Sequence, residues 1–177
     1  MITRRRLIAA AALWPIVPAA FGQAKPLTCG VVTPRQTEGP FFKPQSPKRT
    51  SLVDGKAATL IVSGQVLSPD CKPVSGALLD FWHADEDGEY DNRGFRYRGH
   101  QFADAEGRYR LETIVPAEYP GRARHIHVKV QAPKGRVLTT QLYFPNQPGN
   151  QRDGLFRPEL VMEMPKREEG RFNFVVA

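Results

Sequence analysis

The sequence predicts an all-β fold, a β-sandwich of two mostly antiparallel sheets joined by long connecting loops. Short runs rich in Val, Ile, Phe, Tyr and Thr recur at even intervals along the 177 residues. Gly, Pro and Asp separate these runs, and 15 glycines and 16 prolines favour many turns over long helices. No segment keeps a 3.6-residue apolar period over the length of a helix. A chain of this size can bury the core of one domain, and it shows no internal repeat.

Seven runs are expected to be strands, because apolar or alternating β-favouring residues fill each one. Turn sequences such as Ser68-Pro69-Asp70 separate neighbouring runs. The polar stretch 85–106 is expected to be a long insertion that runs over the surface. In chain order, the expected strands span residues 59–67, 77–83, 108–114, 125–131, 137–144, 159–164 and 171–176.

Residues 1–24 differ from the rest and are typical of a secretory signal peptide. Three consecutive arginines from Arg4 precede an apolar run over 7–21, and residues 22–24 offer a small-residue cleavage site. The apolar run is too short and too interrupted by proline to span a membrane. The arginines fit a twin-arginine export signal, with an ordinary secretory leader as the alternative. We therefore expect a periplasmic or secreted protein that is not attached to a membrane once the leader is removed.

The mature part is expected to consist of an irregular N-terminal arm, 25–57, and the sandwich domain, 58–177. Residues 1–24 hold three arginines and no acidic residue, so removing them lowers the net charge from +7 to +4. The remainder gives a mild preference for anionic small molecules. No Lys/Arg run in the mature part is interleaved with aromatic residues, so nucleic acid is not an expected partner. The two cysteines, Cys29 and Cys71, either form one disulfide or are two separate thiols.

Two of the four histidines, His125 and His127, are two residues apart on an expected strand. Side chains at positions i and i+2 project from the same face of a strand, so one strand can offer both imidazoles to one metal ion. Tyr119 precedes them across a Pro-Gly turn, and its phenol can join the same ion. Two polar side chains on the solvent face of an amphipathic strand are the alternative explanation of the pair.

Several sequence blocks surround these residues in a fixed order. The two most specific are Tyr119 to His127, with its His-x-His ending, and Thr139 to Phe144, which reads Thr-Thr-Gln-Leu-Tyr-Phe. Together the blocks resemble the intradiol ring-cleavage dioxygenases, the family of protocatechuate 3,4-dioxygenase and catechol 1,2-dioxygenase, over roughly residues 37–145. The other blocks are Thr37-Glu38-Gly39-Pro40-Phe41-Phe42, Val62-Ser63-Gly64-Gln65-Val66, Pro73-Val74-Ser75-Gly76-Ala77, Asp80-Phe81-Trp82-His83-Ala84-Asp85, Asp87-Gly88-Glu89-Tyr90, Gly107-Arg108-Tyr109 and Thr113-Ile114-Val115-Pro116.

The resemblance implies a β-sandwich that holds one Fe(III) ion per chain with two tyrosines, two histidines and a solvent hydroxide. Phenolate and imidazole are donors that suit ferric iron better than soft metals. Two anionic phenolates also stabilise the ferric state against reduction. Matched motif by motif, the implied metal ligands are Tyr90, Tyr119, His125 and His127.

The same matching places the family's active-site arginine at Arg122 and its active-site glutamine at Gln141. Arg124 competes with Arg122 for the arginine role, and the strand period and the motif favour Arg122. Tyr97 is the nearest competitor of Tyr90, but it lacks the residues that precede Tyr90 in the motif.

Four other polar or aromatic side chains near the motifs are expected to be structural. Tyr143 and Trp82 are expected to pack in the core. His83 and His100 are expected at the surface or in structural roles, with His83 as a candidate for the rim of the site.

The resemblance implies an oxidoreductase that uses O2 to cleave the bond between the two hydroxyl carbons of a catechol-type substrate, giving a muconate-type diacid. In the family, one tyrosine leaves the iron, and the motif assigns this role to Tyr119, which with the hydroxide would accept the catechol protons. Arg122 would stabilise charge that develops on the ring, and Gln141 would hydrogen-bond near the substrate oxygens. The preferred catechol stays open, and so does whether the chain forms a homo-oligomer.

Two other classes of protein compete with the enzyme. A secreted β-sandwich binding module of the transthyretin or carboxypeptidase-regulatory type would explain the turn and core residues without catalysis. It leaves the histidine pair and Gln141 unexplained. A sandwich that binds copper or zinc, with the tyrosines as bystanders, is the third possibility.

Overall fold

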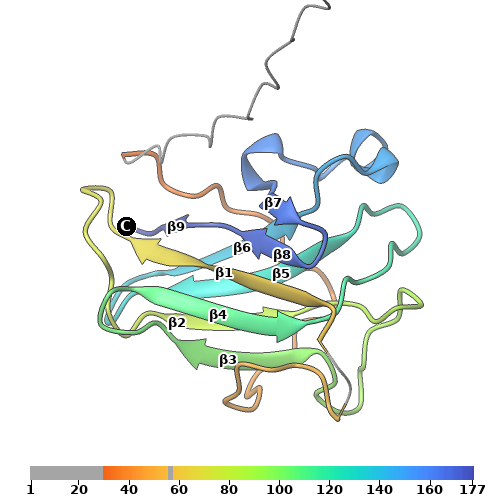
Figure 1. The fold of residues 1–177 in the computed structure, drawn as a ribbon, viewed down its shortest axis with the longest axis horizontal. Helices are drawn as coiled ribbons and strands as arrows, with labels where there is room; N and C mark the ends of the chain where they lie inside the picture. Colours follow the sequence, from red (N-terminus) through yellow and green to blue (C-terminus); the bar gives the residue numbers. More distant parts are fainter. Residues whose placement is uncertain (1–29, 56–57) are drawn as a thin grey trace, which may run out of the picture.

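The structure, a computed structural model, describes residues 30–55 and 58–177. Two β-sheets face each other across a hydrophobic core, which confirms the predicted all-β sandwich (Figure 1). The helical elements in the described residues are two short 3₁₀ turns, Pro148–Gln151 (η1) and Pro158–Leu160 (η2). Within these residues no helix has the length and apolar character needed to cross a membrane. The expected leader, 1–24, and Cys29 lie outside the described residues.

The first sheet is built around its longest strand, which pairs with a different partner along each edge. The sheet order is β4-β1-β8-β7, and β9 extends the same edge of β1 beyond β8. The β1–β4 pair is antiparallel, whereas β8 and β9 run parallel to β1. The strand bounds are β1 Leu60–Leu67, β4 Arg108–Thr113, β7 Glu163–Lys166, β8 Glu169–Arg171 and β9 Phe174–Val175.

The second sheet is antiparallel throughout and has the order β3-β2-β5-β6. Register matters here, because it sets Trp82 of β2 and Gln141 of β6 on either side of His127 in β5. Residues that are direct partners across adjacent strands share one face of a sheet. The strand bounds are β2 Leu78–Trp82, β3 Arg98–Phe102, β5 His125–Gln131 and β6 Val137–Tyr143.

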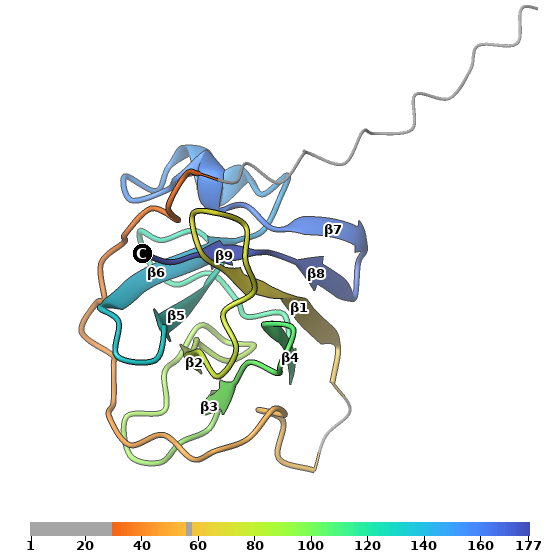
Figure 2. The same ribbon diagram turned by 90° about the vertical axis from the view of Figure 1, so that its left-hand side faces the viewer.

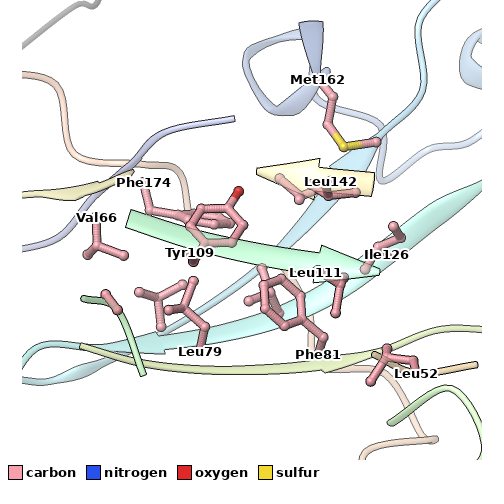
Figure 3. Close-up of a cluster of buried hydrophobic side chains, with 14 of the residues drawn as sticks. Leu52, Val66, Leu79, Phe81, Tyr109, Leu111, Ile126, Leu142, Met162 and Phe174 are labelled. Carbon is pink, nitrogen blue, oxygen red and sulfur yellow. The ribbon is translucent and has the colours of Figure 1, made fainter. Parts of the chain in front are cut away.

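The core lies between the two sheets and follows the alternation of the strands. In β5, Ile126, Val128 and Val130 are fully buried and belong to the main apolar cluster. Figure 3 shows side chains of both sheets, among them Phe81 and Leu111, packed against one another in this layer. The opposite side chains of β5 therefore project from the outer face of the sheet, where the histidine pair lies.

A close backbone contact explains why the last strand of the first sheet is divided into β8 and β9. A Cβ atom on Gly64 would lie 1.8 Å from the carbonyl oxygen of Phe172, so only glycine leaves room for this crossing. The hydroxyl of Tyr109 donates to the same carbonyl at 2.8 Å. Gly64 of the β1 motif is therefore required by packing rather than by chemistry.

Two expectations about the elements are wrong. The stretch 85–106 is not only a surface insertion, because it contains strand β3, in which Arg98 and Gln101 are buried. Its polar residues give no alternating apolar signal, and pairing with β2 forms the strand instead. The expected strand 159–164 is divided between η2 and the start of β7, since Pro158 opens a 3₁₀ turn there.

The N-terminal arm, residues 30–55, wraps the outer face of the second sheet. Figure 2 shows it (orange) passing beside β6 and β5 and continuing toward β3. Backbone hydrogen bonds attach it on the way, from Gln36 N to the carbonyl of Thr139 at 2.9 Å and from Arg49 N to the carbonyl of His100 at 2.9 Å. Elsewhere, Cys71 is disulfide-bonded.

Candidate metal centre and active site

The histidine pair lies on the outer face of β5, yet both side chains are buried. His125 is 3% exposed and His127 is 1% exposed. The arm covers His127, since a Cβ atom on Gly39 would lie only 3.5 Å from its Cε1. The rings of Tyr119 and Tyr143 lie against His125, at centroid distances of 5.9 and 6.0 Å. Gly39 has a φ of +69°, a left-handed conformation that favours glycine. The alternative explanation, two polar side chains on a solvent-exposed strand face, is therefore wrong, because both side chains lie in a buried polar site.

The two imidazoles turn the same nitrogen toward each other. Nε2 of His125 and Nε2 of His127 are 3.0 Å apart. The other nitrogen of His125, Nδ1, lies 2.6 Å from the carbonyl oxygen of Ala123, which fixes the proton on Nδ1 and leaves a lone pair on Nε2. Burial lowers the pKa of His125 to about 4 and that of His127 well below its usual value, so both rings are neutral donors at neutral pH.

A tight turn places Tyr119 beside this pair. Tyr119, Pro120, Gly121 and Arg122 form a β-turn in which Arg122 N donates to the carbonyl of Tyr119 at 2.9 Å. Proline at the second position and glycine with a φ of +80° at the third are the residues that a type II turn requires. The ring centroid of Tyr119 is 5.9 Å from that of His125.

Tyr90 approaches the site from the loop that follows β2. Its ring centroid lies 5.8 Å from that of Tyr119 and 6.2 Å from that of His127. The Tyr90 hydroxyl is buried and has no hydrogen-bond partner among the described residues. Burial raises the pKa of this phenol, with the nearby Tyr119 adding to the effect. An orphaned buried hydroxyl is costly unless a ligand or ion satisfies it.

Arg122, the last residue of the turn, points into the site. It is held there by the carboxylate of Asp153, a residue that was not predicted from the sequence. Nε of Arg122 donates to both carboxylate oxygens of Asp153, at 3.1 and 3.0 Å. The Asp153 side chain is 1% exposed and also accepts from the backbone N–H groups of Ala123 and Leu155, each at 2.9 Å. One terminal nitrogen, Nη1, is left to donate to the Tyr119 hydroxyl at 3.3 Å. Four hydrogen bonds to one buried carboxylate make a rigid anchor.

Gln141 lies on the far side of the guanidinium. Its Oε1 accepts from Nη2 of Arg122 at 2.6 Å and from the hydroxyl of Tyr143 at 2.8 Å. Its Nε2 donates to the backbone carbonyl of Thr37 in the arm at 2.9 Å. Tyr143 is fully buried but belongs to this polar network and to a separate small apolar cluster, not to the main core.

Aromatic rings from the arm and from β2 wall the site. Phe41 stacks on Tyr90 at a centroid distance of 4.3 Å, and Trp82 stacks on His127 at 4.8 Å. The expectation that Trp82 packs in the main core is thus refined, because its buried ring faces the outer side. The arm carbonyl of Phe41 accepts from Nη1 of the buried Arg98 at 2.6 Å. Two backbone carbonyls, at Thr37 and Phe41, therefore tie the arm over the site.

The competing residues make other contacts. The Tyr97 hydroxyl donates to Glu86 at 2.9 Å, and its ring stacks on His83. His83 is buried, with its ring nitrogens 2.6 Å from Thr113 Oγ1 and 2.6 Å from a backbone carbonyl, and has a structural role. His100 contacts the backbone of Ser46 at the edge strand.

The donors that converge here fit a hard metal ion. They are two neutral imidazoles and two phenols, one of them without any partner. A backbone carbonyl that accepts from the second nitrogen of a histidine, as at Ala123, is the usual support for a metal-binding imidazole. In the described part of the chain, no three His, Cys, Asp or Glu side chains gather in one place. The phenols are thus the partners that the histidine pair has in this site.

Comparison with known proteins shows which proteins the chain is similar to. A family model described as Dioxygenase matches residues 37–176. The chain is 33% identical over 144 residues to catechol 1,2-dioxygenase 2 of Acinetobacter lwoffii, covering 66% of this chain and 52% of the relative. It is 30% identical over 162 residues to chlorocatechol 1,2-dioxygenase of Pseudomonas sp. (strain P51), covering 75% of this chain and 64% of the relative. The chain thus spans less than two thirds of the length of these curated relatives.

A solved structure aligns over nearly its whole length. It is the dioxygenase domain of a dioxygenase carbohydrate-binding protein fusion from the cellulolytic bacterium Streptomyces sp. SirexAA-E, with 56% identity and a TM-score of 0.78. The alignment covers 82% of this chain and 98% of that domain. The catechol 1,2-dioxygenase of Pseudomonas arvilla C-1 aligns with 28% identity and a TM-score of 0.73, over 81% of this chain and 62% of that chain.

Proposed function

Because the chain belongs to the intradiol ring-cleavage dioxygenase family, we propose that it cleaves a catechol-type substrate between its two hydroxyl carbons with O2. The product would be a muconate-type diacid. One observation carries the proposal. Two buried, neutral imidazoles lie with their Nε2 atoms 3.0 Å apart, and two phenols lie beside them. A transthyretin-type binding module would leave this group of two imidazoles and two phenols unexplained.

We propose that one Fe(III) ion per chain is held by Tyr90, Tyr119, His125 and His127. When bound, ferric iron would supply a Lewis acid that lowers the pKa of the catechol hydroxyls and activates the ring toward O2. The orphaned hydroxyl of Tyr90 supports this assignment, because a cation would satisfy it as a phenolate.

Tyr119 is the protein group best placed to take a proton from the substrate. Its hydroxyl already accepts a hydrogen bond from Nη1 of Arg122 at 3.3 Å. A phenolate held at this position would be the form that can accept a proton. Phe41 stacks face to face on Tyr90 at 4.3 Å and contacts Tyr119 edge to face at 6.0 Å, so the ring of Tyr90 is the more closely covered of the two.

Arg122 and Gln141 would act on the bound ring rather than on the metal. The guanidinium is held by Asp153 before any substrate arrives, so it needs no rearrangement to face negative charge that develops on the ring. Gln141 is fixed at both ends, by Arg122 and by Thr37, and would orient the substrate oxygens. The aromatic walls formed by Phe41 and Trp82 would exclude water from the reacting centre.

Colour and oxygen uptake test the proposal. Ferric phenolate absorbs visible light strongly, so protein expressed with ample iron should be red to brown. It should also contain one iron per chain. Tyr119→Phe should shift or weaken this absorption and lower oxygen uptake with catechol. Tyr97→Phe is the matched control, because it removes a buried phenol outside the site and should leave the colour unchanged.

Colourless protein without stoichiometric iron would contradict the proposed function. A product that carries an aldehyde would show cleavage beside, rather than between, the hydroxyl carbons. A panel of catechols in an oxygen electrode would then identify the preferred substrate.

We also propose that the chain is exported to the periplasm or the medium by the twin-arginine route. The support is the arginine-led leader over residues 1–24, which lies outside the described residues. Retention of an Arg4→Lys/Arg5→Lys precursor in the cytoplasm would support this route, and unchanged export would contradict it.

A further inference from the structure

A cavity lies beside the segments that follow β4 and β6 and beside β7. Its volume is about 650 Å³, and its walls include Val115 after β4, Phe144 after β6, and Met164 in β7. None of the proposed iron ligands lines it, and neither do Arg122 or Gln141. The cavity is therefore separate from the candidate active site, and a ligand could bind in it whether or not the proposed function is correct.

Three cationic side chains line this cavity, and no acidic side chain does. They are Arg124, Lys166 and Arg167. Among the described residues, none of the three forms an ion pair. Glu169, the cross-strand partner of Lys166 in the β7–β8 hairpin, pairs with Arg171 at 2.5 Å. Cations gathered around one hollow repel each other, and an anion in the hollow would relieve that repulsion.

The environment of Arg124 is the strongest indication of a missing anion. Its Nε is buried and lacks a hydrogen-bond partner within the described residues. A guanidinium that is partly withdrawn from water without an acceptor costs free energy. Arg122, two residues earlier, shows the contrast, since Asp153 satisfies its Nε twice. Arg124 has the same partial burial without a carboxylate from the protein.

The remaining walls indicate what kind of anion fits. Val115, Met164 and two prolines provide an apolar lining beside the cations, with the buried Phe144 behind them. The thioether of methionine makes favourable contacts with aromatic rings. Polar recognition at one side and an apolar wall at the other are what small-molecule pockets require. A simple inorganic anion would use the cations and leave the apolar wall without a contact.

We infer that this cavity is a binding site for an aromatic carboxylate, with the carboxylate at Arg124, Lys166 and Arg167 and the ring against Val115 and Met164. The guanidinium fork matches the two oxygens of a carboxylate, and the two side chains from the hairpin add charge from the other side.

Calorimetric titration of the full chain with benzoate tests the inference. Binding should saturate at one equivalent in this site and weaken as salt is added. Benzamide, which keeps the ring and loses the charge, should bind at least tenfold more weakly. The double variant Lys166→Gln/Arg167→Gln should also lower benzoate affinity about tenfold, the effect of removing two partly exposed charges. The matched control is Arg136→Gln, an exposed arginine in the β5–β6 turn, and it should leave affinity unchanged.

Each other outcome overturns the inference. Benzoate that binds equally well to the Lys166→Gln/Arg167→Gln variant must occupy another place, the candidate active site included. Equal affinity for inorganic phosphate would show that the apolar wall contributes nothing. The absence of any saturable binding would remove the site altogether. None of these results depends on iron or on turnover, so the proposed function is tested separately.

Discussion

The two faces of strand β5 are both buried, but they are buried by different means. The inner face, with Ile126, Val128 and Val130, packs against the opposite sheet. On the outer face, an irregular arm covers His127, and the rings of Tyr119 and Tyr143 lie against His125. The inner face needs only apolar side chains of complementary shape. The outer face buries polar atoms, and each of these needs a hydrogen-bond partner or a ligand. Alternate side chains of one strand can thus have different roles: one set packs in the core and stabilises the fold, and the other set forms the candidate active site.

The largest expected effect belongs to the inner face. Ile126→Ala leaves the flanking histidines unchanged and opens a cavity in the core, so the free energy of unfolding should fall by about 2–5 kcal/mol. Denaturant unfolding of the metal-free protein measures this. A loss below about 1 kcal/mol would mean that the inner face is loosely packed around Ile126. The two faces would then differ less in packing than this comparison states.

A change at the anchor of the outer face should affect turnover more than folding. Asp153→Asn keeps the volume but removes the charge that holds Arg122, and the guanidinium loses its fixed position. We expect kcat to fall by roughly 10–100-fold with iron binding and colour retained, because misplacing a positioned group costs about this much.

Asp104→Asn is the matched control for Asp153→Asn. It removes an exposed carboxylate that pairs with Arg108 at 2.9 Å and, among the described residues, makes no hydrogen bond to the polar network of the site. Its kcat should equal that of the unmodified protein. If Asp153→Asn lowers kcat no more than Asp104→Asn does, the anchor has no role in positioning.

The smallest effect concerns pH. His83 is a buried histidine on the core side of β2, and burial lowers its pKa to about 4 from 6.5. The unfolded chain therefore binds more protons than the folded one between these values, and stability falls as pH drops from about 6.5 toward 4. His83→Gln should flatten the curve of unfolding free energy against pH by up to about 1.4 kcal/mol per pH unit.

The quantity to compare in this test is the difference between the two proteins. His125 and His127 also have lowered pKa values and add to the slope in both. Parallel curves for the unmodified protein and His83→Gln would show that His83 accepts a proton in the folded state. The structural role assigned to it would then be wrong.

Alternation and turn chemistry were enough to predict the sandwich and the shared face of His125 and His127. The turn at Tyr119 also follows from its Pro-Gly pair. Strand β3 could not be predicted, because Arg98 and Gln101 become buried only through pairing with β2 and contact with the arm. A short polar strand of this kind carries no signal in its own residues.

Only the site residues that belong to local sequence motifs could be predicted. Asp153 lies 31 residues from Arg122, in a loop without a recognisable spacing, so only the fold brings the two together. The burial of the outer face could not be predicted for a similar reason. Nothing in the motif around Gly39 says that this segment crosses β5, since that depends on the path of the whole arm.

The arm is fastened above the site by the main-chain carbonyls of Thr37 and Phe41. A carbonyl is the same whichever side chain its residue carries, so mutational drift at these two positions leaves the fastening intact. What must be kept is the side chain at the other end of each bond, Gln141 or Arg98. Selection for this fastening therefore acts on the side chains of strands β6 and β3, and the two hydrogen bonds themselves place no demand on the side chains at positions 37 and 41 of the arm.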